Sequence, residues 1–170
     1  IDDIEECRKF KEKETVTWIN VDGLHDIELI RKLGDMYGLH PLLLEDILNT
    51  TQRPKVEDYE DYIFFVLKMI YFDQSREEIT AEQISIVFGE NFVLSFQESS
   101  GDVFDPIRER INKSKGRIRT SGPDYLSYAL IDAIIDNYFS VMEKIGEKIE
   151  EIESELMESP TEETMYSIHT

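Results

Sequence analysis

Apolar residues recur at helical spacing in three parts of the chain. Residues 26–37 carry them three and four positions apart and are followed by Gly38, which is typical of an amphipathic helix that ends at a glycine. A second helix is predicted over residues 41–48, because proline suits a first helical turn and Pro54 disfavours helical geometry just before it. The third, residues 123–158, has no breaker, and at about 1.5 Å per residue it exceeds ~45 Å. We expect this helix to extend beyond the core.

Four runs rich in β-branched and aromatic residues predict strands. Residues 59–72 are almost continuously apolar, which is typical of a strand buried on both faces, in a sheet with helices on each side. Residues 82–88 and 91–96 are separated by Gly89-Glu90, a hairpin signal, so three consecutive strands are expected at the antiparallel centre of the sheet. Residues 15–21 add another strand. The predicted fold is α/β, a three-layer α/β/α sandwich with a mixed, partly antiparallel sheet and a long C-terminal helix.

The predicted organisation is one core with an appended helix. Residues 1–122 form the α/β core, with short surface helices near residues 1–13 and 103–111. Residues 123–158 pack on this core and extend from it, and residues 159–170 begin a further helix at Pro160. Because the sequence begins at Ile1 and stops a few residues into that helix, we expect a longer parent protein.

Charge and cysteine content narrow the class of protein. Against 37 acids there are 18 bases, giving a formal net charge of −19, which disfavours nucleic acid and anionic membranes and favours cations or basic partners. Such a charge is also a common route to solubility. The basic segment at residues 113–122 is expected to be a solvated connector. The single cysteine, Cys7, excludes internal disulfides and, with no signal peptide or membrane-spanning run, favours the cytoplasm.

Two groups of carboxylates are candidate metal ligands. On the helix of residues 41–48, Glu45 and Asp46 fall opposite the apolar face and point away from the core. Asp132 and Asp136 lie four apart on a narrow polar stripe where the other helix faces look buried, and a buried carboxylate needs a partner. Oxygen ligands without Cys or clustered His select Mg²⁺ or Ca²⁺ over zinc. Spacing alone also fits solvated helix faces, which are common in an acidic chain.

No arrangement typical of an enzyme is present. The sequence has no GxSxG, Walker or HExxH motif, and its three histidines, His25, His40 and His169, are scattered. His40 precedes Pro41 and is expected to cap or pack the following helix. The prediction is therefore that the chain is not an enzyme and takes no small organic substrate.

Four segments, in order and with similar gaps, resemble the cytosolic domain of CorA-type magnesium/cobalt ion transporters. They are VTWINVDGLHD (16–26), YGLHPLLLEDIL with QRPKVEDYEDYIFFVLK (37–68), GDVFDPIRERI (101–111) and DYLSYALIDAIIDNYF (124–139). The resemblance covers almost the whole chain. The stalk, the two membrane helices and the Gly-Met-Asn signature of that family are missing from this sequence, so this chain alone cannot transport an ion.

The resemblance implies the cytosolic, divalent-cation-sensing domain of a homopentameric magnesium channel in the inner or plasma membrane. The domain would gate Mg²⁺ uptake through a pore beyond this chain, and the missing C-terminal helices would hold the protein in the membrane. The family places regulatory sites between neighbouring domains, and its ligands fall on Glu45, Asp46 and Asp132, with a further ligand on the stalk. The expected ion is Mg²⁺, with Co²⁺ or another divalent cation as alternatives.

Two other functions remain open at this point. The same family contains zinc transporters with a similar cytosolic fold. A stand-alone acidic domain that binds a partner helix with its protruding helix is the second alternative. Two hydrophobic runs of about twenty residues in the full reading frame would exclude that second reading.

Overall fold

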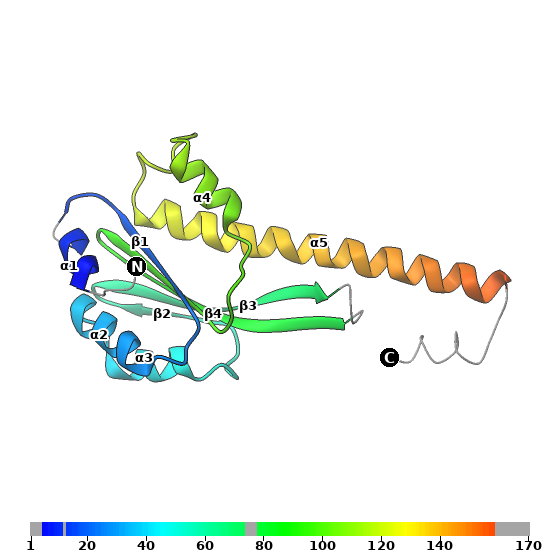
Figure 1. Ribbon diagram of the computed structural model, residues 1–170, viewed down its shortest axis with the longest axis horizontal. Helices are drawn as coiled ribbons and strands as arrows, with labels where there is room; N and C mark the ends of the chain where they lie inside the picture. Colours follow the sequence, from blue (N-terminus) through cyan, green and yellow to red (C-terminus); the bar gives the residue numbers. More distant parts are fainter. Residues whose placement is uncertain (1–4, 12, 74–77, 159–170) are drawn as a thin grey trace.

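The computed structural model describes residues 5–11, 13–73 and 78–158, in which five strands form one sheet covered by helices on both faces (Figure 1). The elements, in chain order, are α1 (Glu5–Lys11), β1 (Thr17–Asp22), α2 (Ile27–Tyr37), α3 (Pro41–Leu48), β2 (Lys55–Tyr59), β3 (Tyr62–Asp73), β4 (Glu78–Gly89), β5 (Phe92–Gln97), α4 (Asp105–Asn112) and α5 (Pro123–Glu158). The residues predicted to begin a further helix, 159–170, lie outside the described part.

The sheet has the strand order β1-β5-β4-β3-β2. β3, β4 and β5 pair antiparallel in its centre, and β1 pairs parallel with β5, so the predicted mixed sheet is confirmed. One prediction about the strands was wrong. Residues 59–72 were expected to form one strand, whereas the structure has a hairpin of β2 and β3 with a turn at Glu60-Asp61. The short run KVEDY becomes a strand because β3 supplies its hydrogen-bond partners.

Helices lie on both faces of this sheet, which confirms the three-layer architecture. One core cluster joins α2 and α3 to the sheet, and on β3 it includes the fully buried Phe64 and Val66. The other cluster joins α4 and α5 to the opposite face and includes Met69 of the same strand. Because side chains alternate along a strand, β3 contributes to both cores, as its continuous apolar character predicted.

The ends of α2 and α3 follow from individual residues. Asp26 caps α2 by accepting a hydrogen bond from the Leu29 N–H, and Gly38 ends the helix with φ 70°, a conformation that glycine adopts without strain. His40 caps α3 through Nδ1, which accepts from the Leu42 N–H at 3.2 Å, and Pro41 follows in the first turn. The predicted capping role of His40 and the predicted bounds of α3 are confirmed.

The long helix α5 spans 36 residues and runs past the end of the sheet (Figure 1). Its first half packs on the sheet, and the Tyr138 hydroxyl donates a hydrogen bond to the Lys68 carbonyl of β3. Beyond Val141 none of its described residues is buried. None of the described helices combines the length and apolar character needed to cross a bilayer.

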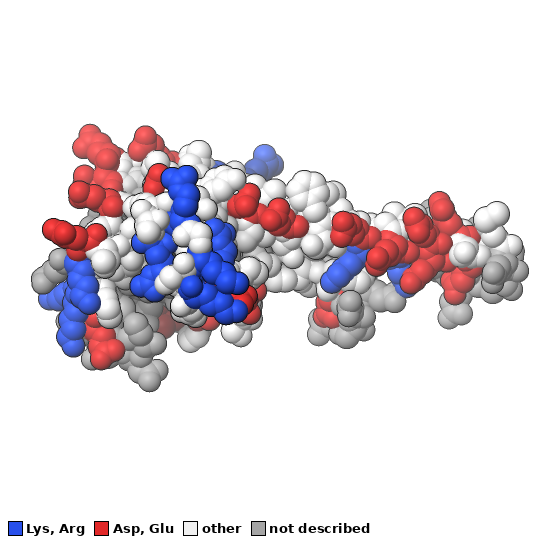
Figure 2. All heavy atoms as spheres, turned by 90° about the horizontal axis from the view of Figure 1, so that it is seen from above, with Lys and Arg blue, Asp and Glu red and all other residues white. Residues whose placement is uncertain are grey.

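The connection between α4 and α5 forms a local basic surface in an acidic molecule. Lys113, Lys115, Arg117 and Arg119 are exposed there, and Figure 2 shows Lys and Arg side chains gathered over this part of the upper layer while Asp and Glu follow α5. The Arg117 guanidinium lies 5.9 Å from the centre of the Tyr125 ring. The segment is therefore a solvated connector whose cations partly pack on the start of α5.

Candidate metal centre

α3 presents the acidic pair Glu45 and Asp46 on the outer side of the molecule. Leu43 and Ile47 are fully buried against the sheet, and this fixes the rotation of the helix about its axis. Glu45 is consequently exposed, and the Asp46 side chain keeps 26% of its surface accessible. The predicted outward direction of both carboxylates agrees with this arrangement.

The C-terminal turn of α3 is fastened to the central strands. The Lys68 ammonium of β3 donates to the Thr50 carbonyl at 2.7 Å, and the Gln83 amide of β4 donates to the Asp46 carbonyl at 3.1 Å. A cation near the carboxyl end of a helix also interacts favourably with the helix dipole. These two contacts hold the backbone of Asp46 in a defined position relative to the sheet.

The carboxylate of Asp46 already has two partners within the chain. The Lys55 ammonium at the start of β2 lies 2.5 Å from Asp46 Oδ2, and the Gln52 amide donates to Oδ1. Lys55 also lies 2.7 Å from Glu57 Oε1. Burial lowers the pKa of the Lys55 ammonium, but hydrogen bonds and charge attraction to Asp46 and Glu57 outweigh it, so that the pKa is raised overall. Lys55 is therefore a charged partner of Asp46.

Asp132 lies on α5, on the other side of the sheet from α3. The expectation that Asp132 and Asp136 sit among buried faces was wrong, because both are exposed. Neighbouring apolar residues on α5 are exposed as well, including Ile135 and Phe139, the latter with 57% of its surface accessible. The opposite face of this part of α5 is packed on the sheet, so both carboxylates are exposed because they lie on the outer face of the helix.

A single chain does not bring the predicted ligands together. Glu45 and Asp46 are adjacent on α3, whereas Asp132 is in the opposite layer, and the described residues contain no group of three His, Cys, Asp or Glu side chains placed to hold a metal ion. The chemistry of the donors still fits Mg²⁺, which takes a few carboxylate oxygens and retains several waters. Each face of the chain thus carries some of the carboxylates that were predicted to be ligands.

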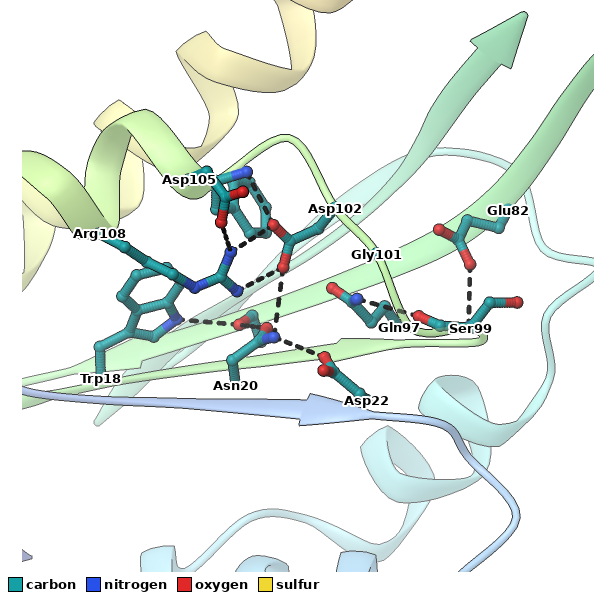
Figure 3. A network of polar contacts seen from close by, with 12 residues as sticks. Trp18, Asn20, Asp22, Glu82, Gln97, Ser99, Gly101, Asp102, Asp105 and Arg108 are labelled. Carbon is teal, nitrogen blue, oxygen red and sulfur yellow. Dashed lines mark hydrogen bonds and ion pairs between the residues drawn. The ribbon is translucent and has the colours of Figure 1, made fainter. Parts of the chain in front are cut away.

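A second polar cluster lies under α4, beside the ends of β1 and β5 (Figure 3). Asp102, with 4% of its side chain exposed, accepts two hydrogen bonds from Arg108 at 2.5 and 2.6 Å. The hydrogen bonds to Asp102 raise the pKa of Arg108 despite its partial burial. The Arg108 guanidinium also lies 5.4 Å from the Trp18 ring centre. This cluster fixes the loop before α4 to β1.

The acids around this cluster are engaged by the chain itself. Glu82 accepts from the Tyr71 hydroxyl at 2.7 Å and from the Ser99 N–H at 3.0 Å, and Glu98 accepts from the Gln83 N–H at 2.6 Å. The hollow that these two acids line is therefore a weaker candidate for a cation than α3, where Glu45 is exposed and Asp46 keeps part of its surface accessible.

Replacing Arg108 by alanine is expected to lower the free energy of unfolding by about 2 kcal/mol. The substitution leaves the buried Asp102 carboxylate without its cation, and the loss is moderate because Arg108 itself is partly exposed. Urea denaturation measures the change. Arg31→Ala, on the exposed side of α2, is the matched control and should stay within about 0.5 kcal/mol of the wild type. Equal stability of the two variants would show that the Asp102–Arg108 pair contributes little.

Comparison with protein families matches residues 13–170 to the family described as CorA-like Mg²⁺ transporter protein. This chain belongs to the CorA family. The cobalt/magnesium transport protein CorA of Thermotoga maritima is 48% identical over 167 residues, which are 98% of this chain and 48% of that protein. CorA of Methanocaldococcus jannaschii is 26% identical over 152 residues, 89% of this chain and 47% of that protein. The chain spans about half the length of these relatives.

Solved structures show the same fold. The soluble domain of CorA from Methanocaldococcus jannaschii matches with a TM-score of 0.73 at 22% identity, over 90% of this chain and 60% of that one. The ZntB cytoplasmic domain from Vibrio parahaemolyticus matches with a TM-score of 0.59 at 19% identity, over 93% and 62% of the two chains. The predicted membership of the CorA family and the predicted fold are confirmed.

Sequence reasoning missed the residues that support Asp46 in this CorA-family domain. Lys55 lies nine positions from Asp46 on a strand that was not predicted, and Gln83 is 37 positions away. For Lys68 a signal was present, because a lysine inside an apolar strand needs a polar partner, which here is the Thr50 carbonyl.

Proposed function

We propose that this CorA-family chain is the cytosolic, divalent-cation-sensing domain of a membrane transporter for magnesium. The observation that carries the proposal is the placement of the candidate ligands on opposite faces of one chain, Glu45 and Asp46 on α3 and Asp132 on α5. A head-to-tail contact places one face of a copy against the other face of the next copy, and such contacts generate a ring if the rotation closes. The family resemblance implies a homopentamer.

Electrostatics supports a sensing role for such a contact. Copies that each carry a formal net charge of −19 repel one another, and the facing carboxylates add to this repulsion where they meet. A bound divalent cation supplies positive charge between these carboxylates. The closed arrangement is then stabilised by the cation between Glu45 and Asp46 of one copy and Asp132 of the next. When the cation is lost, these carboxylates repel one another. The cation thus shifts the equilibrium towards the state that binds it better.

The direct test is thermal unfolding of the chain with and without millimolar Mg²⁺, at an ionic strength matched with a monovalent salt. Binding to the native state raises the midpoint above that of the salt control. The rise should disappear in Asp46→Asn and persist in Asp35→Asn, which removes an exposed carboxylate from the neighbouring helix α2. Identical midpoints in Mg²⁺ and in the monovalent salt would count against the proposal.

A zinc-responsive domain is the second candidate, because the ZntB cytoplasmic domain shares the fold. The candidate ligands here are carboxylates only, which favours Mg²⁺. We therefore expect Mg²⁺ to raise the unfolding midpoint in a way that depends on Asp46. We do not expect any rise induced by Zn²⁺ to depend on Asp46. An Asp46-dependent response to micromolar Zn²⁺ with none to millimolar Mg²⁺ would reverse this assignment.

A further inference from the structure

The Lys55 ammonium lies between two carboxylates, 2.5 Å from Asp46 Oδ2 and 2.7 Å from Glu57 Oε1. The Lys55 side chain is 28% exposed, so this is a partly desolvated pair whose charges are screened less than those of an open surface pair. Asp46 is the carboxylate that the proposed function assigns to the cation. The chain therefore already holds a positive charge at that ligand.

Packing keeps the ammonium at this place. Lys55 pairs with Val66 in the β2–β3 ladder, which fixes its backbone, and its Nζ lies 5.7 Å from the centre of the buried Phe64 ring. Side chains two residues apart on a strand share one face, so Lys55 and Glu57 project together. Glu57 is held in turn by the Tyr59 hydroxyl, which donates to Oε2 at 3.0 Å.

We propose that Lys55 is a tethered competitor for the cation at Asp46 and sets the concentration at which the site fills. This inference rests on the proposed function. The ammonium and a divalent ion are both attracted to the Asp46 carboxylate, and two cations cannot occupy it at contact distance without strong repulsion. Glu57 gives the displaced ammonium another partner, so it remains paired when it leaves Asp46. Binding at Asp46 is then an exchange of cations, and its affinity is lower than that of a free carboxylate.

Lys55→Met tests the proposal in the complete protein that contains this chain, because methionine keeps an unbranched apolar stem without the charge. The Mg²⁺ concentration that gives half of the thermal stabilisation is expected to fall about tenfold, since one positive charge next to the ligand is removed. Lys55→Arg keeps the charge and should stay within about twofold of the wild type. Lys115→Met, in the exposed connection before α5, controls for the change in net charge and should have no effect.

Glu57→Gln is a second variant with an effect of opposite sign. Without Glu57 the ammonium has only Asp46 as a partner, so the half-stabilising Mg²⁺ concentration should rise severalfold. Asp58→Asn is the control, because it removes the same charge from the next residue of β2, which projects to the other face of the strand. This variant should shift the half-stabilising Mg²⁺ concentration less than Glu57→Gln does.

The outcomes separate the two proposals. Suppose that the wild type responds to Mg²⁺ through Asp46, but Lys55→Met has the same half-stabilising Mg²⁺ concentration as the wild type. This result overturns the competitor role of Lys55 and leaves the proposed function standing. If neither wild type nor Lys55→Met shows an Asp46-dependent response, the proposed function fails and this inference fails with it. A lower half-stabilising Mg²⁺ concentration in Lys55→Met, together with loss of the Mg²⁺ response in the double variant Lys55→Met/Asp46→Asn, supports both the proposed function and the competitor role.

Discussion

Asp46→Asn is expected to remove the Mg²⁺-dependent protection of the complete protein from proteolysis. At a Mg²⁺ concentration ten times the Kd, binding lowers the population of open, cleavable states by about tenfold. The substitution removes the charge that attracts the cation and keeps the shape of the side chain. Limited proteolysis across a Mg²⁺ titration should therefore show about tenfold slower cleavage of the wild type and a nearly constant rate for the variant.

Asp35→Asn is the matched control for this experiment, because it removes an exposed carboxylate from α2 in the same layer. Its cleavage should slow with Mg²⁺ as in the wild type. Protection of Asp46→Asn equal to that of the wild type would contradict the assignment of Asp46. Loss of protection in both variants would indicate a general charge effect.

Phe64→Ala is expected to lower the free energy of unfolding by about 4 kcal/mol. Phe64 is fully buried on β3, between the sheet and the layer of α2 and α3, and its removal leaves a cavity that the surrounding strands cannot close. Urea denaturation measures the loss. Because stability of this core also fixes the rotation of α3, the variant should weaken the Mg²⁺ response as well.

Val56→Ala on the adjacent strand β2 is the control, since Val56 is exposed and its truncation leaves no cavity. We expect its stability to stay within about 0.5 kcal/mol of the wild type. A loss below about 1 kcal/mol in Phe64→Ala would mean that the core around α3 relaxes easily and does not fix the direction of Asp46.

The helices α3 and α5 could be predicted from the sequence to within their observed bounds, because local signals decide both. Pro41 and Pro123 suit first turns, and apolar residues continue at helical spacing behind each of them. The direction of Glu45 and Asp46 followed from the same periodicity. Local pattern is sufficient where one face of an element is apolar and the other is polar.

Features that depend on distant partners could not be predicted. β2 is stabilised by its ladder with β3, and the short alternating run KVEDY does not reveal that partner. Asp132 looked buried because apolar residues surround it on α5, and only the three-dimensional structure shows that it faces away from the sheet while Leu130 and Ile134 beside it are fully buried. The contact of Lys55 with Asp46 needs both β2 and α3 in place.

The central claim is that the cation site is shared between two copies, α3 of one and α5 of the next. Sedimentation velocity on mixed variants tests it most directly. An Asp46→Asn chain keeps an intact α5 face, and an Asp132→Asn chain keeps an intact α3 face, so a mixture can form one complete contact that neither variant forms alone. In Mg²⁺ the account predicts a faster-sedimenting dimer in the mixture and monomers for each variant. A mixture that sediments like its separate components, while the wild type associates in Mg²⁺, would contradict a site shared between copies.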